Sequence, residues 1–89
     1  MKITKTGTAG TSDSSDVVIT VNPNENEGVK VELTGKSVVL KQFSKQMEAA
    51  VKQVVSDMGV ENVTVNAADN GALDYVIRAR VRTAILRAV

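Results

Sequence analysis

The stretch GTSDSSDVVITV, residues 10–21, decides how the chain folds. Its first seven residues are small and polar, so they cannot build a core, and their side chains bond readily to nearby backbone. The remaining five alternate, with Val17, Ile19 and Val21 on one side, and this period of two predicts a strand. A polar turn that leads into a strand predicts a fold based on a β-sheet.

The turn at residues 10–16 has two interpretations. A run of Ser, Thr and Asp residues fits an ordinary solvated hairpin turn, which is the usual role of such a stretch. It also fits a serine displayed at the tip of a rigid hairpin as a point of covalent attachment. The rest of the chain has to distinguish between the two.

The chain has 89 residues, of which 43% are apolar and 24% are charged. This length predicts one domain, residues 1–89, with one core. No apolar run approaches the roughly 20 residues that a membrane helix needs, and residues 1–5 lack the apolar core of a signal peptide. We therefore expect a cytoplasmic protein that does not act in a membrane.

The chain contains no cysteine and no histidine. It therefore offers no disulfide, no thiolate nucleophile, no imidazole base and none of the usual zinc or haem ligands. Its carboxylates are scattered rather than paired at a useful spacing. We expect no catalytic residue and no metal site, and a protein that carries or contacts rather than catalyses.

The first half of the chain reads as strands. Residues 2–9 predict at best an edge strand. Residues 17–21 and 29–33 both alternate with a period of two, and the Pro-, Gly- and Asn-containing segment 22–28 between them predicts a loop. We expect these two strands to form an antiparallel hairpin with one apolar face.

The second half changes period. Residues 38–58 carry a helical apolar stripe, with Ser37 as the expected N-cap and Gly59 as the stop, and Phe43 is the large aromatic expected in the core. Residues 62–67 predict a strand. Residues 73–88 fit either a strand or a helix, and we favour a helix capped by Asp74. The predicted class is α+β, in the order β-β-β-α-β-α.

The predicted last helix carries four arginines. Arg78 and Arg82 lie four apart on one flank, and Arg80 and Arg87 lie seven apart on the other. The pattern fits a solvated basic rim, or a clamp for anionic groups or an acidic partner surface, with Arg78 and Arg82 as the binding residues. With only two aromatic residues, the chain lacks the stacking platform typical of nucleic-acid binding.

Three motifs give the chain a resemblance to the acyl carrier protein (γ subunit) of citrate lyase. They are AGTxxSSDV at residues 9–17, DNGALD at 69–74 leading into IRARV at 77–81, and, more weakly, QF at 42–43. Together they span nearly the whole chain. The usual helical-bundle carrier fold is excluded, because its acceptor serine opens a helix, whereas Ser14 precedes a strand.

The resemblance implies that Ser14 is the acceptor of a 2'-(5''-phosphoribosyl)-3'-dephospho-CoA group, joined covalently through a phosphodiester. Ser15 is then expected to be a permissive turn residue. Asp16 matches a motif position without an assigned role, so it either helps the modifying enzyme to dock or fixes the turn.

The resemblance also implies the partners. The carrier would hold acetyl and citryl groups as thioesters while citrate is cleaved to oxaloacetate and acetate. It would work with the alpha (acyl transferase) and beta (citryl lyase) subunits and with a holo-carrier synthase. The carrier of malonate decarboxylase is the alternative, although Asp near positions 74–75 replaces that family's usual Pro. An interaction module that carries no group is a second alternative.

Overall fold

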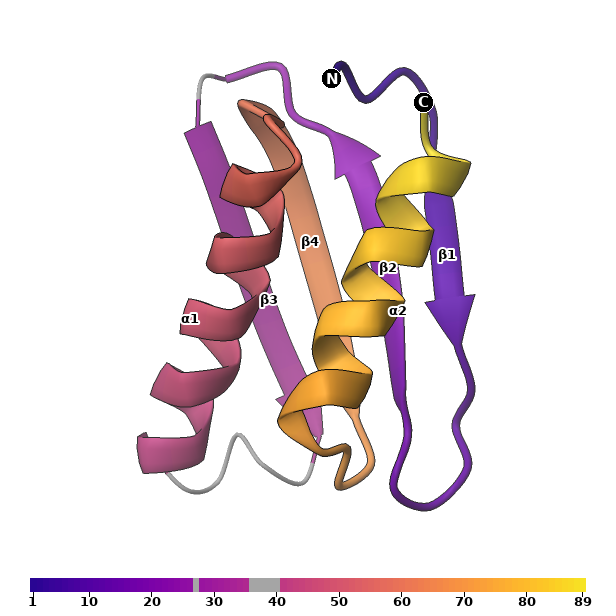
Figure 1. Cartoon of the computed structure of the whole chain (residues 1–89), viewed down its shortest axis with the longest axis vertical. Helices are drawn as coiled ribbons and strands as arrows, with labels where there is room; N and C mark the ends of the chain where they lie inside the picture. Colours follow the sequence, from indigo (N-terminus) through magenta and orange to yellow (C-terminus); the bar gives the residue numbers. More distant parts are fainter. Residues whose placement is uncertain (27, 36–40) are drawn as a thin grey trace.

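The computed structural model describes residues 1–26, 28–35 and 41–89, which form a four-stranded sheet covered on one face by two helices (Figure 1). The elements are β1 (Gly7–Gly10), β2 (Val17–Pro23), β3 (Gly28–Gly35), α1 (Lys41–Asp57), β4 (Asn62–Asp69) and α2 (Asp74–Arg87). The predicted α+β class and the order β-β-β-α-β-α are confirmed. No helix in the described part of the chain is long and apolar enough to cross a bilayer.

The strand order is β1-β2-β4-β3. β2 is antiparallel to both β1 and β4, and β3 runs parallel to β4. The predicted hairpin between residues 17–21 and 29–33 is therefore wrong, because β4 lies between these two strands. The loop after Pro23 has to cross two inter-strand spacings, about 10 Å, which is within reach of a chain of this length.

The physical reason for this order is burial. On β4, Val63, Val65 and Ala67 are at most 1% exposed, whereas no residue of β3 is fully buried. Strand β4, with its fully buried apolar face, therefore lies inside the sheet, and β3 lies at its edge. A parallel pair also needs a long crossover connection, which α1 supplies between β3 and β4.

The core lies between the sheet and the two helices. Strand β2 contributes the same alternating face that the sequence predicts, namely Val17, Ile19 and Val21, each with no exposed surface. The helical side chains that pack against the strands are Met47, Val51, Val54 and Val55 of α1 and Ile77, Val81, Ala84 and Ile85 of α2. Both described helices lie on the same face of the sheet (Figure 1), so the core forms as one layer between that face and the helices.

Helix α1 departs from prediction at its beginning. Phe43, expected in the core, is 53% exposed, and the buried positions of α1 begin one turn later, at Met47. The space between the first turns of α1 and α2 stays open as a pocket, and Phe43 lies at its edge rather than filling it. The predicted cap Ser37 lies outside the described residues. Gly59 follows the helix with φ of +69°, as a C′ glycine should.

The C-terminal segment forms a helix, α2, which is the alternative that we favoured over a strand. The prediction that Asp74 caps this helix is wrong. Leu73 is the N-cap, its carbonyl accepts hydrogen bonds from Val76 and Ile77, and no side chain caps the helix. Asp74 is instead the first helical residue, and its carboxylate accepts a 2.6 Å hydrogen bond from Arg78 Nε. A carboxylate in the first turn also interacts favourably with the helix dipole. This preference explains why the sequence pattern indicated a helix that begins near Asp74.

Candidate functional site

The turn between β1 and β2, residues 11–16, is held together by Asp16. Its Oδ2 accepts hydrogen bonds from the backbone N (3.1 Å) and the hydroxyl (2.6 Å) of Thr11, and its Oδ1 accepts one from Val17 N at 2.7 Å. Arg80 of α2 adds a bidentate pair, with Nε 3.1 Å from Oδ1 and Nη2 3.0 Å from Oδ2. The two ends of the turn are thereby tied to each other and to the last helix.

These contacts explain the acidity of Asp16. The Thr11 hydroxyl, the Val17 amide and the Arg80 guanidinium all favour the ionised form, and they lower the pKa of Asp16 from 3.8 to about 2. The carboxylate is therefore charged across the physiological range. Of the two roles left open by the sequence, the contacts support fixing of the turn.

The same turn packs on the segment that follows β4. Ser15 N donates to Asn70 O (2.8 Å), Asn70 N donates to Asp16 O (2.9 Å), and Asn70 Nδ2 donates to Ser12 O (3.2 Å). Asp69, only 1% exposed, accepts from the amides of Gly71 and Ala72. Two turns that lie far apart in sequence thus brace each other at one end of the sheet (Figure 1).

Ser14 lies at the tip of this braced turn and is exposed. Asp16 N donates to Asp13 O at 3.2 Å, which closes a four-residue turn around Ser14 and Ser15. Ser15 adopts φ of +64°, in the left-handed region that glycine adopts readily and other residues occupy uncommonly. No hydrogen bond joins the Ser14 hydroxyl to another described residue. The backbone of Ser14 is fixed while its oxygen faces solvent.

The four arginines of α2 divide into two pairs, as the spacing predicts. Arg80 and Arg87 reach back to the N-terminal half, since Arg87 Nη1 donates to Thr8 O at 2.8 Å. Arg78 and Arg82 lie on the opposite flank, beside Asp57 near the end of α1. Arg78 pairs with Asp74, and Arg82 is exposed without an ion pair to any described side chain.

Sequence reasoning missed the role of Arg80. Its flank of the helix was recognised, but its partner Asp16 is 64 residues away. The available signal was chemical, because a carboxylate next to a buried strand needs a compensating cation. The sequence offers several arginines for that purpose and does not say which one is in reach.

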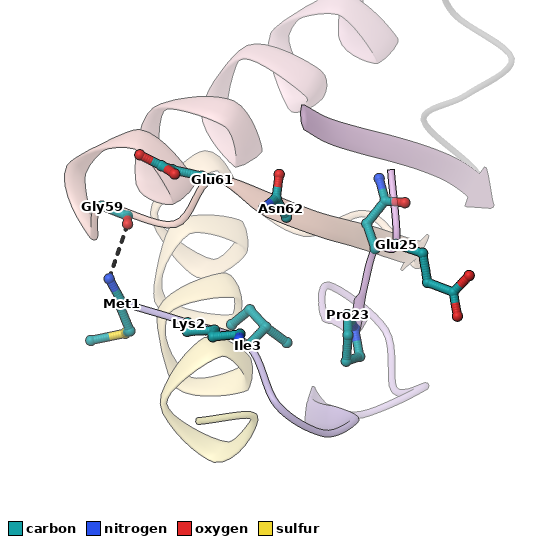
Figure 2. A pocket seen from close by; sticks show the side chains of 9 residues that line it. Met1, Lys2, Ile3, Pro23, Glu25, Gly59, Glu61 and Asn62 are labelled. Carbon is teal, nitrogen blue, oxygen red and sulfur yellow. Dashed lines mark hydrogen bonds between the residues drawn. The ribbon is translucent and has the colours of Figure 1, made fainter. Parts of the chain in front are cut away.

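A pocket of about 540 Å³ lies elsewhere. Figure 2 shows it between the N-terminal segment (Met1 to Ile3), the end of β2 at Pro23, and the start of β4 near Asn62. Residue Val17, next to the braced turn, is at the other end of β2, about 20 Å away along a strand of this length. This pocket is therefore separate from the turn that presents Ser14.

The four-stranded mixed sheet and its two helices make this a small α+β protein, with Ser14 on a turn at one end of the sheet. Its fold differs from that of the helical-bundle carriers. A family model described as malonate decarboxylase delta subunit (MdcD) matches residues 4–88. The citrate lyase acyl carrier protein of Halothermothrix orenii is 52% identical over 99% of this chain and 90% of its own length. Citrate lyase acyl carrier protein 2 of Salmonella typhimurium is 43% identical over 99% and 89%. The chain therefore belongs to the citrate lyase acyl carrier protein family.

A solved structure shares the fold. A crystal structure of a Thermus thermophilus protein matches with a TM-score of 0.55 at 14% identity, over 94% of this chain and 16% of that one. At this identity the likeness concerns the fold alone. It indicates that the arrangement of sheet and helices also occurs as a small part of a much longer protein.

Proposed function

We propose that the protein is the acyl carrier subunit of citrate lyase, and that Ser14 carries a 2'-(5''-phosphoribosyl)-3'-dephospho-CoA arm through a phosphodiester. The observation that supports the assignment is the exposed hydroxyl of Ser14, bonded to no other described residue, on a turn fixed from both sides by Asp16 and Asn70. Membership of a family whose relatives are named citrate lyase acyl carrier proteins supplies the substrate class.

The described residues fit such a group. The attachment reaction needs a hydroxyl that a transferase can approach, and Ser14 is exposed. The arm itself supplies the terminal thiol that holds acetyl or citryl, which a chain without cysteine cannot provide. This chain contributes a rigid anchor, so the tethered end reaches a defined volume and stays concentrated near its partners.

In this proposal the partners carry out the chemistry. The alpha subunit exchanges acetyl for citryl and releases acetate, and the beta subunit cleaves the citryl group to oxaloacetate and leaves acetyl on the thiol. A holo-carrier synthase loads Ser14 from an activated phosphate precursor of the arm, whose phosphate leaving group the serine hydroxyl displaces. No group of three or more potential metal ligands gathers among the described residues. The part assigned to Asp16 and Arg80 is to hold the turn in the form that each of these enzymes recognises.

The malonate decarboxylase carrier is the second candidate, because the matching family model bears that name. Against it stand the citrate lyase names of the relatives and the Asp74-Tyr75 pair in place of the Pro expected there. The two differ in cargo. Reconstitution of the acetylated, loaded chain with its acyl transferase should yield a citryl adduct from citrate, with release of acetate, whereas a malonyl adduct from malonate would reassign the protein.

The attachment is tested by intact-mass measurement. The chain is produced together with its holo-carrier synthase, alongside the variants Ser14→Ala and Ser12→Ala. The parent and Ser12→Ala should each gain the mass of one phosphoribosyl-dephospho-CoA group, and Ser14→Ala should gain none. Ser12 is a matched control because it is an exposed serine of the same turn. Full loading of Ser14→Ala, or no loading of the parent, would overturn the proposal.

A further inference from the structure

A small apolar pocket opens between the first turns of the two helices. It has a volume of about 130 Å³ and is lined by Phe43, Gln46, Met47, Ala72, Leu73, Asp74 and Ile77. Met47 and Ile77, 3% and 4% exposed, form its base, and Phe43 and Leu73, 53% and 59% exposed, stand at its rim. Two large apolar side chains thus remain in solvent around an apolar hollow, a feature that in soluble proteins marks a binding surface.

The pocket lies next to the turn that presents Ser14. Asn70 binds the backbone of that turn at Ser12, Ser15 and Asp16, and the wall residues Ala72 and Leu73 follow two and three positions later. An extended chain covers at most about 3.6 Å per residue, so Asn70 and Leu73 are at most about 11 Å apart. Figure 1 shows the turn, the segment after β4 and the beginnings of α1 and α2 at the same end of the molecule.

The size and lining of the pocket limit what it accepts. An apolar cavity of roughly 150 Å³ holds a molecule the size of benzene, so about 130 Å³ admits one compact apolar fragment. A pantetheine chain offers such a fragment in its geminal dimethyl group, followed on one side by a hydroxyl and an amide that the Gln46 side chain can bind.

Resting on the proposed function, we propose that this pocket is the docking site for the pantetheine segment of the arm on Ser14 of the same chain. Tethering makes even a weak site effective, because the attached arm is confined to the volume around the pocket and its local concentration is raised. The docked arm would keep its thiol close to the carrier surface between visits to the partner subunits.

The three methionines provide a direct test. Carbon-13 methyl spectra are compared for the apo chain and for the loaded chain, with loading verified by intact mass. The Met47 methyl signal should shift and should show contacts to the dimethyl group of the arm. Met1 and Met58, which do not line this pocket, serve as internal references and should keep their positions.

A variant pair tests the rim. Leu73→Ser removes a rim side chain, and Leu86→Ser is the control near the far end of α2, with 51% against 59% exposure. Both should load fully. Leu73→Ser should lose the Met47 shift and raise the alkylation rate of the arm thiol several-fold, while Leu86→Ser should change neither.

The outcomes separate the two proposals. A chain that gains no mass overturns the proposed function and the docking site with it. A loaded chain with an unmoved Met47 signal overturns the docking site alone. A Met47 shift that follows protein concentration in the apo chain would assign the pocket to a second copy and would likewise overturn the docking site.

Discussion

Asp16 is one of two buried acidic residues in the described chain. Its carboxylate accepts five hydrogen bonds, two from Thr11, one from Val17 and two from Arg80. A carboxylate with this many donors acts as a cross-link between a turn and a helix. The neighbouring Asp13 is exposed and binds the turn only through its backbone. The Asp16 side chain therefore links the turn to α2, whereas Asp13, three positions earlier, contributes backbone hydrogen bonds.

The first prediction concerns this cross-link and its pH dependence. Because the folded pKa of Asp16 is about 2 and its ordinary value is 3.8, the unfolded chain binds more protons between these values. The contribution of Asp16 is complete above pH 3.8 and is lost as the pH falls toward 2. Asp16→Asn should lower the melting temperature at pH 7 and reduce the loss of stability in that acid range.

Thermal unfolding followed by circular dichroism at several pH values measures this effect. Asp13→Asn is the matched control and should leave the melting temperature nearly unchanged. Equal melting temperatures for Asp16→Asn and the parent at pH 7 would show that the contacts around Asp16 do not hold the turn.

At the scale of elements, Gly10 sets how closely β1 approaches β2. It has φ of +102°, and a Cβ placed on it would lie 1.7 Å from the carbonyl oxygen of Val17. No side chain fits at that distance. Gly28, which begins β3, shares the positive φ, at +112°, but a Cβ there would meet no atom within 4 Å.

This pair yields the second prediction. A residue other than glycine at positive φ costs about 1–3 kcal/mol, and both Gly10→Ala and Gly28→Ala should incur that cost. Gly10→Ala should lose clearly more stability, because the β1–β2 pair must also separate. Urea unfolding measures the difference, and equal losses for the two variants would mean that the close approach is unimportant.

Helix α2 carries the third prediction. Arg78 and Arg82 lie on the flank that does not contact the turn, and we expect this flank to bind an anionic surface of a partner subunit. The double variant Arg78→Ala/Arg82→Ala should load normally at Ser14 and bind the alpha or beta subunit about tenfold more weakly, as expected for a loss of about 1.4 kcal/mol.

Calorimetric titration against each subunit measures this binding. Lys52→Ala, which removes one exposed cation from α1, is the control and should bind like the parent. Unchanged affinity of the double arginine variant for both subunits would contradict a partner-binding role for Arg78 and Arg82.

At the scale of the whole molecule, the strand order brings the site together. β4 lies between β2 and β3 and ends at Asp69, opposite Val17. The turn before Val17 and the turn after Asp69 therefore meet at one end of the sheet. Both helices also begin at this end (Figure 1), so the Ser14 turn, Asn70 and the small apolar pocket are neighbours. A simple hairpin of residues 17–33 would not have placed them together.

Much of the candidate site could be predicted from the sequence because its signals are local. An exposed polar turn before an alternating strand is readable from residues 10–21, and so is a helix that stops before Gly59. Phe43 shows the limit of such reasoning. Its position on the apolar stripe is correct, but whether the space above it is filled depends on Leu73 and Ile77, which belong to another part of the chain.

The sequence by itself determined the class of fold, the order of the elements and the exposure of the Ser14 turn, since period and composition act over a few residues. Only the tertiary structure decided that β4 separates β2 from β3, that Arg80 binds Asp16, and that Phe43 borders a pocket. The physical reason is that strand pairing and side-chain burial depend on contacts between residues that are far apart in the sequence. Several strands and several arginines suit the same place locally, and packing selects one.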